Sequence, residues 1–234
     1  VLNTTKLATH MIPGFATIKR DLDPAIRAGL NVLRIGAHCT EINTTKRYVE
    51  HAKNYAVEAV CCLMMSSMVS TKTLVLQSLL AEEYGASAVS IYDSAGAFLP
   101  SDVSERIAAL KDALSIEVGF HGHNNLGMAT ANTLAAYEAG ASIFDCSACG
   151  FGAGAGNAPI ETVIAAFEKS GHKTGIDINK AFDMVNLAKD SFIQNPPLND
   201  DLSITTGLHG VFSGFKKHVI REAERCLIDP RQLI

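Results

Sequence analysis

A repeated glycine-plus-strand unit constrains the fold of this chain more than any other feature of its sequence. Three segments look alike, each with a helix-like run, a glycine and then a short β-rich run: Arg27–Ile35, Glu83–Asp93 and Tyr137–Asp145. The shared glycines, Gly29, Gly85 and Gly140, lie 56 and 55 residues apart, and glycine accepts the left-handed conformation just past a helix end. Further strand-like runs lie near the midpoints, so a helix-plus-strand unit recurs about every 28 residues, which indicates parallel βα units.

The repeat predicts six strands joined by helices. The expected strands are near-continuous apolar runs, typical of strands covered on both faces, at residues 6–12, 31–37, 57–64, 87–92, 116–121 and 142–146. The expected helices span 43–55, 71–84, 101–113, 127–139 and 159–170. Beyond about residue 175 the βα step is lost and residues 178–228 look helical, with a linker around 195–201. We therefore predict two domains, a barrel portion at residues 1–174 and a helical C-terminal subdomain at residues 175–234.

Six βα units fit two α/β architectures. An eight-unit barrel needs two more units, whereas a doubly wound sheet can stop at six. The chain begins with Val1 rather than methionine, which is consistent with an upstream segment. We expect a parallel (β/α) TIM-type barrel that lacks its first two βα units.

Composition excludes several classes of protein. The 234 residues are 47% hydrophobic and 19% charged, with a net charge of −4, and this composition is typical of a globular protein. The sequence contains no basic patch of the kind that nucleic-acid-binding proteins carry. No apolar run approaches the roughly 18 residues that cross a membrane, and no signal-peptide pattern opens the chain. We expect a cytoplasmic protein with no nucleic-acid or membrane partner.

The six cysteines indicate thiols in a reducing compartment rather than a disulfide framework, because most of them lie in apolar, strand-like segments. They are Cys39, Cys61, Cys62, Cys146, Cys149 and Cys226. Cys146 and Cys149 form one isolated C-x-x-C pair. Two small residues at a strand end are a simpler interpretation of this pair than a zinc or redox site.

Polar residues gather at the ends of five successive predicted strands, where parallel α/β folds collect their working groups. These polar ends are Gly36–Glu41, Met65–Ser67, Asp93–Gly96, His121–Asn125 and Asp145–Ser147. On a strand, residues i and i+2 point to the same side, so His121 and His123 would aim both imidazoles at one spot. That arrangement suits two ligands of one divalent metal. The alternative is that the histidines cap the next helix or hydrogen-bond to each other.

A metal needs ligands beyond the two histidines, and the sequence offers several candidates for them. Asp93, Asp145 and Glu41 are candidate carboxylates on other strands, and a missing N-terminal strand is another source. Asp93 has an equally good interpretation as a cap of the loop that follows it. The glycine-rich run Gly150–Pro159 either approaches a phosphate or carboxylate through its backbone N–H groups or is a flexible turn before a helix that begins at Pro159.

Several of these segments together resemble the 4-hydroxy-2-oxovalerate aldolases. The matching segments run in order along nearly the whole chain and are Ala37–Glu41, Leu63–Ser66, Asp93–Gly96, His121–Leu126 and Gly150–Pro159. These aldolases belong to a metal-dependent lyase group on a TIM barrel that also contains the hydroxymethylglutaryl-CoA lyases and isopropylmalate synthases. The H-x-H pair is shared by the group, whereas the glycine run ending in Asn-Ala-Pro is specific to the aldolases.

The resemblance implies an activity, a cofactor and a partner. The activity is retro-aldol cleavage of 4-hydroxy-2-oxopentanoate to pyruvate and acetaldehyde. Mn²⁺ or a similar divalent metal would be held by His121, His123 and an aspartate near the family's N-terminus, as a Lewis acid toward the pyruvate enolate. Ser94 and His121 would contact the 2-oxo acid substrate. The C-terminal helices would bind an acylating aldehyde dehydrogenase.

Two departures from the family pattern leave the catalytic residues unassigned. The Arg-Asp-Gly motif of the family's first strand and the nearby histidine base have no counterpart here, and Phe212 stands at the position of a family tyrosine. His209 is the nearby group that could replace the lost hydroxyl. These departures keep two alternatives open, namely a decarboxylating or condensing relative that uses the same pyruvate-enolate site, and a non-catalytic relative that binds the dehydrogenase.

Overall fold

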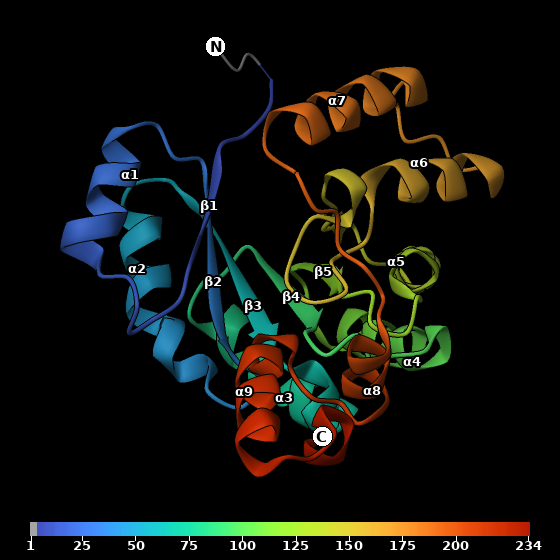
Figure 1. Cartoon of the computed structure of the whole chain (residues 1–234). Helices are drawn as coiled ribbons and strands as arrows, with labels where there is room; N and C mark the ends of the chain where they lie inside the picture. The colour runs from blue at the N-terminus through green and yellow to red at the C-terminus, as the bar shows by residue number, and fades with distance from the viewer. Residues whose placement is uncertain (1–3) are drawn as a thin grey trace. The chain divides into compact units, whose positions relative to one another are not determined.

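The computed structural model describes residues 4–234 and contains one six-stranded sheet whose strands follow chain order (Figure 1). The strands are β1 (Ala8–Met11), β2 (Val32–His38), β3 (Glu58–Met64), β4 (Ala88–Asp93), β5 (Glu117–Gly122) and β6 (Ile143–Phe144). The β1–β2, β2–β3 and β3–β4 pairs are parallel. A doubly wound sheet reverses its strand order at a switch point, and the described strands show no reversal. This order is that of a (β/α) barrel segment and confirms the predicted parallel α/β fold; the two missing units stay a prediction.

The helices also follow the prediction, with one omission. Between strands lie α1 (Asp23–Arg27), α2 (Lys46–Asn54), α3 (Thr71–Glu83), α4 (Pro100–Ala113) and α5 (Ala129–Glu138), and after β6 come α6 (Ile160–Lys169), α7 (Ile178–Ser191), α8 (Asp201–Leu208) and α9 (Lys216–Cys226). The helical character predicted for residues 178–228 is confirmed. The sequence reading missed α1 and the π turn Ile18–Leu22 before it, because elements of five residues each are too short to show a periodic apolar face.

The expected burial of both sheet faces is confirmed for β2, β3 and β4, whereas β1 is largely exposed and β6 is half-buried. In the parallel register, His10 pairs with Arg34, Arg34 with Val60, and Val60 with Ala88. Side chains alternate across the sheet, so Val60, Cys62, Ala88 and Tyr92 form one core cluster on the face that Val60 occupies. The residues of opposite parity are also fully buried, among them Leu33, Ile35, Cys61, Leu63, Val89 and Ile91.

β6 is shorter than the predicted run 142–146, although one bond to β5 continues past its end, from the N–H of Asp145 to the carbonyl of Phe120 at 3.1 Å. After Phe144 the chain bonds to the returning glycine-rich segment: the N–H of Ser147 donates to the carbonyl of Ala158 at 3.1 Å, and the N–H of Ile160 donates to the carbonyl of Ser147 at 2.9 Å. The backbone of Ser147 thus pairs with the glycine-rich segment rather than with β5.

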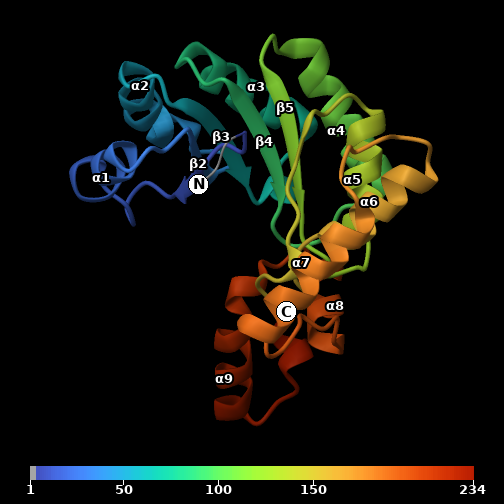
Figure 2. The same ribbon diagram turned by 90° about the horizontal axis from the view of Figure 1, so that it is seen from above.

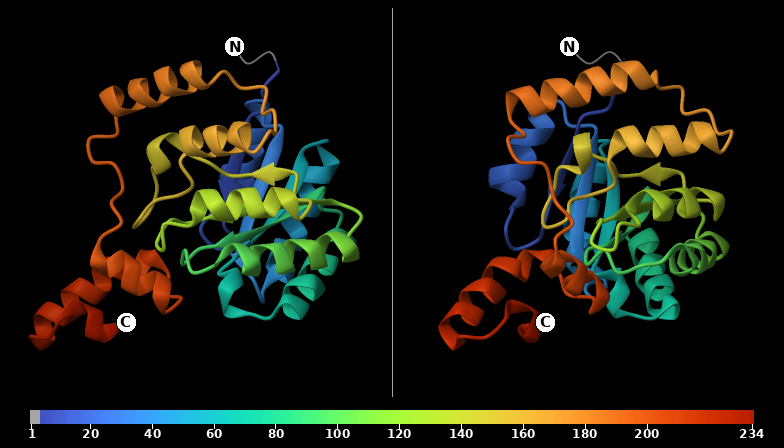
Figure 3. Two further views of the ribbon diagram at one scale, coloured as in Figure 1. Left: turned by 90° about the vertical axis from the view of Figure 1, so that its right-hand side faces the viewer. Right: turned by 45° about the vertical axis from the view of Figure 1, so that its right-hand side comes forward.

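The chain forms two compact units. The first comprises the residues up to Tyr92 together with 105–119 and 140–143, and the second comprises 93–104, 120–139 and 144–234. In the first unit, α1 and α2 lie to one side of β1 and β2 (Figures 1 and 2). In the second unit, α6 packs against both α5 and α7, and Figure 3 shows α7 (orange) running beside α6 (gold). The domain boundary expected at residue 174 stays a prediction.

None of the helices within residues 4–234 is long and apolar enough to cross a membrane.

Candidate active site

His121 and His123 lie next to each other at the carboxyl end of β5. Their ring centroids lie 5.1 Å apart with the ring planes at 66°. Backbone contacts on two sides hold His123, because its N–H donates to the carbonyl of Asp93 at 3.2 Å and it forms a β-bridge with Asn157. The helix that follows is capped by a different residue, since the side-chain Oδ1 of Asn124 accepts from the N–H of Ala129 at 3.2 Å. Helix capping is therefore not the role of the two imidazoles.

Asp145 is the carboxylate that contacts the histidine pair. Its Oδ2 lies 3.1 Å from Nδ1 of His121, and the two side chains are only 16% and 15% exposed. The N–H of Asp145 donates to the carbonyl of Phe120 at 3.1 Å, which fixes the carboxylate beside β5. A metal-binding histidine usually makes such a bond through its other ring nitrogen. Asp145 thus restricts the orientation of the His121 ring.

His123 has the properties of a neutral ligand. Burial and the charge of nearby His121 lower the pKa of His123 to about 4, although the carbonyls of Ala153 and Gly156 act in the opposite direction. Its Nδ1 is buried and has no hydrogen-bond partner among the described residues. A neutral imidazole with an unpaired buried nitrogen can donate its lone pair to a divalent metal, so the chemistry of His123 is compatible with metal binding.

Asp93 caps the turn that follows β4, and it also lies next to the histidine pair, because its carbonyl accepts from the N–H of His123 at 3.2 Å. Its two carboxylate oxygens accept from the N–H groups of Ala97 and Phe98, both at 2.9 Å. The side chain is fully buried, and burial raises the pKa of Asp93 to about 6 against the lowering effect of these N–H groups. Ser94, the predicted substrate contact, is buried directly after it.

The remaining predicted carboxylate, Glu41, belongs to the other compact unit. Within residues 4–234 no cluster of three or more His, Cys, Asp or Glu side chains could hold a metal. The metal-ligand role predicted for His121 and His123 therefore stays a prediction.

The glycine-rich run forms a tight turn packed around His123. The N–H of Asn157 donates to the carbonyl of Gly150 at 2.8 Å, and the N–H of Asn124 donates to the carbonyl of Gly156 at 2.9 Å. Gly156 has a φ of +84°, and a Cβ on it would lie 2.3 Å from the oxygen of Gly150, so only glycine fits. The turn thus buries His123, and Pro159 is the N-cap residue of α6.

Asn157 is a polar residue of this site that the sequence reading missed. Its Oδ1 and the Oγ of Ser147 are buried and have no hydrogen-bond partner within the described chain. Asn157 also forms the β-bridge with His123. The asparagine that closes the glycine run, just before Ala158, was the available signal.

The C-x-x-C pair is not a reactive site. Cys146 and Cys149 are free thiols, as are the other four cysteines. Burial raises the pKa of Cys146 to about 12, and burial also raises the pKa of Cys149. Thiols that stay protonated at neutral pH are poor metal ligands and poor nucleophiles. The preferred interpretation as two small residues at a strand end agrees with this chemistry.

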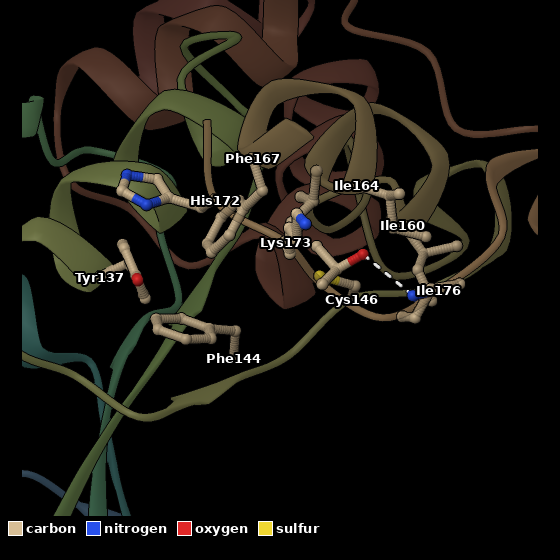
Figure 4. A pocket seen from close by; sticks show the side chains of 11 residues that line it. Tyr137, Phe144, Cys146, Ile160, Ile164, Phe167, His172, Lys173 and Ile176 are labelled. Atoms are coloured by element: carbon tan, nitrogen blue, oxygen red, sulfur yellow. Dashed lines mark hydrogen bonds between the residues drawn. The ribbon is translucent and has the colours of Figure 1, made fainter. Parts of the chain in front are cut away.

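An apolar cavity of about 400 Å³ lies next to β6 and the segment that follows it. Phe144 and Cys146 face it (Figure 4), whereas Asp145 between them bonds His121. The aromatic rings around it are Tyr137, Phe144, Phe167 and His172, and none of its lining residues is a carboxylate. The cavity thus provides apolar surface and one imidazole, that of His172, but no carboxylate.

Comparison with known proteins identifies the family of this chain. Residues 6–188 match the HMGL-like family, and residues 197–234 match the DmpG-like communication domain. The chain belongs to the HMGL-like family. It is 47% identical, over 99% of its length, to the 4-hydroxy-2-oxovalerate aldolase of Spirochaeta aurantia and covers 68% of that protein. It is 46% identical, with the same two coverages, to the 4-hydroxy-2-oxovalerate aldolase of Pectobacterium atrosepticum. The predicted family is confirmed.

Solved structures show the same fold at low sequence identity. The carboxyl transferase domain of Rhizobium etli pyruvate carboxylase superposes with a TM-score of 0.82 at 16% identity, covering 97% of this chain and 42% of that one. The N-terminal domain of a presumed aldolase from Bacteroides vulgatus gives a TM-score of 0.81 at 20% identity, covering 94% and 73%. These likenesses support the α/β fold of the HMGL-like family.

Proposed function

We propose that this protein is a divalent-metal-dependent aldolase that cleaves a 4-hydroxy-2-oxo acid of the 4-hydroxy-2-oxopentanoate type to pyruvate and an aldehyde. The observation that carries the proposal is the pair His121 and His123, with Asp145 bonded to the first ring, in a chain 47% identical to a 4-hydroxy-2-oxovalerate aldolase. A histidine pair with open positions for substrate is the donor set that such chemistry needs.

His121 and His123 would hold the metal, and Mn²⁺ is the ion we propose. When bound, the metal supplies Lewis-acid stabilisation of the negative charge that develops on the 2-oxo oxygen as the carbon–carbon bond breaks. The amide oxygen of Asn157 and the hydroxyl of Ser147, both buried and unpaired within the described chain, are candidate polar contacts for the metal or the substrate.

The remaining site residues position these groups and limit water access. Asp145 holds the His121 ring in one orientation. The glycine-rich turn covers His123, so this imidazole stays neutral and ready to donate its lone pair. Asp93 fixes the turn that carries Ala97 and Phe98, next to Ser94, which we propose contacts the substrate.

Cleavage also requires removal of the proton from the 4-hydroxyl group, with the electrons of the broken bond passing to the pyruvate fragment. Phe212 cannot accept this proton, because its side chain carries no ionisable group. His209 is exposed at the end of α8. Phe212 is the observation that favours a second candidate, a relative that decarboxylates or condenses through the same pyruvate enolate.

We also propose that residues 197–234 bind an acylating aldehyde dehydrogenase, because they match the DmpG-like communication domain. This segment is tied together by ion pairs, in which Nζ of Lys216 bonds Asp200 at 2.6 Å and Arg231 contacts both Asp201 and Asp229. These ion pairs join α8, α9 and the C-terminal turn into one segment that would meet the partner.

Pyruvate release tests the function directly. The full chain is mixed with 4-hydroxy-2-oxopentanoate and Mn²⁺, and pyruvate is followed by coupling to lactate dehydrogenase. We expect turnover in the wild type and in His172→Ala, a histidine of the apolar cavity, but none in His123→Ala. No pyruvate from the wild type would contradict the aldolase proposal. Oxaloacetate decarboxylation in the same preparation would favour the second candidate, and co-purification with a dehydrogenase without turnover would favour a binding role.

A further inference from the structure

Asn125, two residues beyond His123, is bonded to the communication segment, defined here as residues 197–234. Its side chain is fully buried. Its Nδ2 donates to the hydroxyls of Thr206 and Ser213, both at 2.9 Å, and to the carbonyl of Ser203 at 3.2 Å. The carbonyl of Ser203 can only accept a hydrogen bond, so the amide nitrogen, not the oxygen, must face the communication segment.

The contact around Asn125 leaves no free space. A Cβ on Gly207 of α8 would lie 2.9 Å from Cβ of Asn125, and a Cβ on Gly96 would lie 2.6 Å from its backbone nitrogen. Two glycines therefore allow α8 and the turn after β4 to approach Asn125 closely. Close-packed interiors transmit displacement rather than absorbing it. A movement of α8 must therefore displace Asn125 as well.

Ser213 provides a second connection to the same histidine. A Cβ on Gly154 would lie 2.6 Å from both Cβ and Oγ of Ser213, so the glycine-rich turn packs directly on this residue. The same turn bonds Asn124 through the carbonyl of Gly156 at 2.9 Å. Ser213 thus contacts both of the segments that flank His123, one by a hydrogen bond and one by packing.

We propose that Asn125 is a positioning residue that couples the communication segment to His123, so that a displacement of α8 or Ser213 changes the placement of the metal-binding imidazole. The catalytic consequence rests on the proposed function, whereas the coupling itself is a property of the folded chain. Occupancy of the communication segment by a partner would reach the site by this route, and by linkage occupancy of the site would reach the partner surface.

Hydrogen exchange measured by mass spectrometry tests the coupling without metal or turnover. The full-length wild type is compared with Asn125→Ala, Ser213→Ala and the control Asn132→Ala. Asn132 is a matched buried amide, because it is 1% exposed, donates from Nδ2 to the carbonyl of Phe98 at 2.8 Å and has an Oδ1 without a partner in the described chain, as Asn125 does.

We expect Asn125→Ala and Ser213→Ala each to increase exchange several-fold in residues 201–213 and in residues 121–127. Ser213→Ala is the decisive variant, because it removes only a hydroxyl and changes no residue in the segment 121–127 that contains the two histidines. An increase that stays within the communication segment of Ser213→Ala would overturn the proposal. Equal increases at both places in Asn132→Ala would also overturn it, because the effect would then be general loosening.

Kinetics provide the catalytic readout. In Asn125→Ala and Ser213→Ala we expect kcat to fall by about threefold to thirtyfold, the range that residue couplings usually span, with KM for the oxo acid changed less than kcat and Asn132→Ala close to wild type. Unchanged kcat in both variants would overturn the catalytic part of the coupling. A wild type that releases no pyruvate would instead remove the proposed function, while the exchange experiment would still decide the coupling.

Discussion

Nδ1 of His121 lies 3.1 Å from Oδ2 of Asp145, although 24 residues separate the two in the chain. The bond joins the end of β5 to the segment just after β6. Because both side chains are largely buried, the carboxylate restricts rotation of the ring and fixes which ring nitrogen can face a metal.

Replacing Asp145 by alanine should weaken Mn²⁺ binding about 10- to 100-fold, the usual cost of losing the carboxylate behind a histidine ligand. Asp145→Asn should lose less, because one oxygen can still accept the ring N–H. Isothermal titration with Mn²⁺ measures both affinities. Asp190→Ala, on the exposed side of α7, is the control, and an Asp145→Ala protein with wild-type affinity would refute the orienting role.

Replacing His123 by alanine should abolish tight Mn²⁺ binding and turnover and leave the fold intact, because one of the two imidazole donors is lost. Metal content of the purified protein by mass spectrometry, together with circular dichroism, checks both parts. His172→Ala, which changes a histidine of the apolar cavity, should keep its metal. Unchanged metal content in His123→Ala would contradict the ligand assignment.

The stability of the metal-free protein should depend on pH through two buried groups with opposite signs. The pKa of His123 falls from 6.5 to about 4 on folding, so between these values the unfolded chain binds more protons and stability rises with pH. The pKa of Asp93 rises from 3.8 to about 6, so the folded chain binds more protons there and stability falls with pH. The wild type should therefore change little between about pH 4 and 6.

Two variants separate these contributions. In Asp93→Asn only the histidine contributes, and the free energy of unfolding should increase with pH by up to about 1.4 kcal/mol per pH unit over this window. In His123→Ala only the carboxylate contributes, and the free energy should decrease with pH. Urea titrations at about pH 4.5, 5.5 and 6.5 measure both slopes across the range in which the two groups titrate. A chelator keeps the protein free of metal. Slopes of the same sign in the two variants would show that one assignment is wrong.

The parts of this protein that sequence could predict are those governed by local periodicity. The strands β2 to β5 are mostly apolar because both faces of the sheet are largely buried there, and their predicted ends lie within a residue of the observed ones. That the two histidine rings lie close together could also be predicted, since alternation along a strand brings residues two apart to the same side.

The contacts that complete the site join residues far apart in sequence. Asp145 reaches His121 through the pairing of β6 with β5, and the acceptors of Asn125 lie 78 to 88 residues away. The sequence alone could not decide whether Asp93 is a cap or a metal ligand. Only the folded turn shows that the N–H groups of Ala97 and Phe98 bond both of its carboxylate oxygens. Such pairs follow from tertiary register, which no local pattern encodes.

Restoring a hydroxyl at position 212 should increase aldol cleavage. Phe212 is half-buried and packs edge to face on Phe215 with centroids 6.0 Å apart. Phe212→Tyr would place a hydroxyl at the position of the family tyrosine without changing the ring. Phe215→Tyr, an exposed neighbour, is the control and should leave kcat unchanged. Equal rates in Phe212→Tyr and the wild type would mean that another group handles the 4-hydroxyl proton.

Gly154 offers a test of whether the glycine-rich turn supports the metal site. Both Gly154 and Gly175 have positive φ, +61° and +74°, but a Cβ on Gly154 would meet Ser213 at 2.6 Å, whereas a Cβ on Gly175 would meet nothing within 4 Å. Gly175→Ala should therefore lower the free energy of unfolding by about 1 kcal/mol through backbone strain alone. Gly154→Ala should lower it by about 1–3 kcal/mol more, the usual cost of overpacking.

The same displacement should reach the metal, because the turn that contains Gly154 encloses His123. We therefore expect Gly154→Ala to weaken Mn²⁺ binding and Gly175→Ala to leave it unchanged, as measured by titration of the folded proteins well below their melting temperatures. If both variants lost equal stability and both kept wild-type Mn²⁺ affinity, the turn would be a simple connection, and the contact between Gly154 and Ser213 would have no part in holding the imidazole.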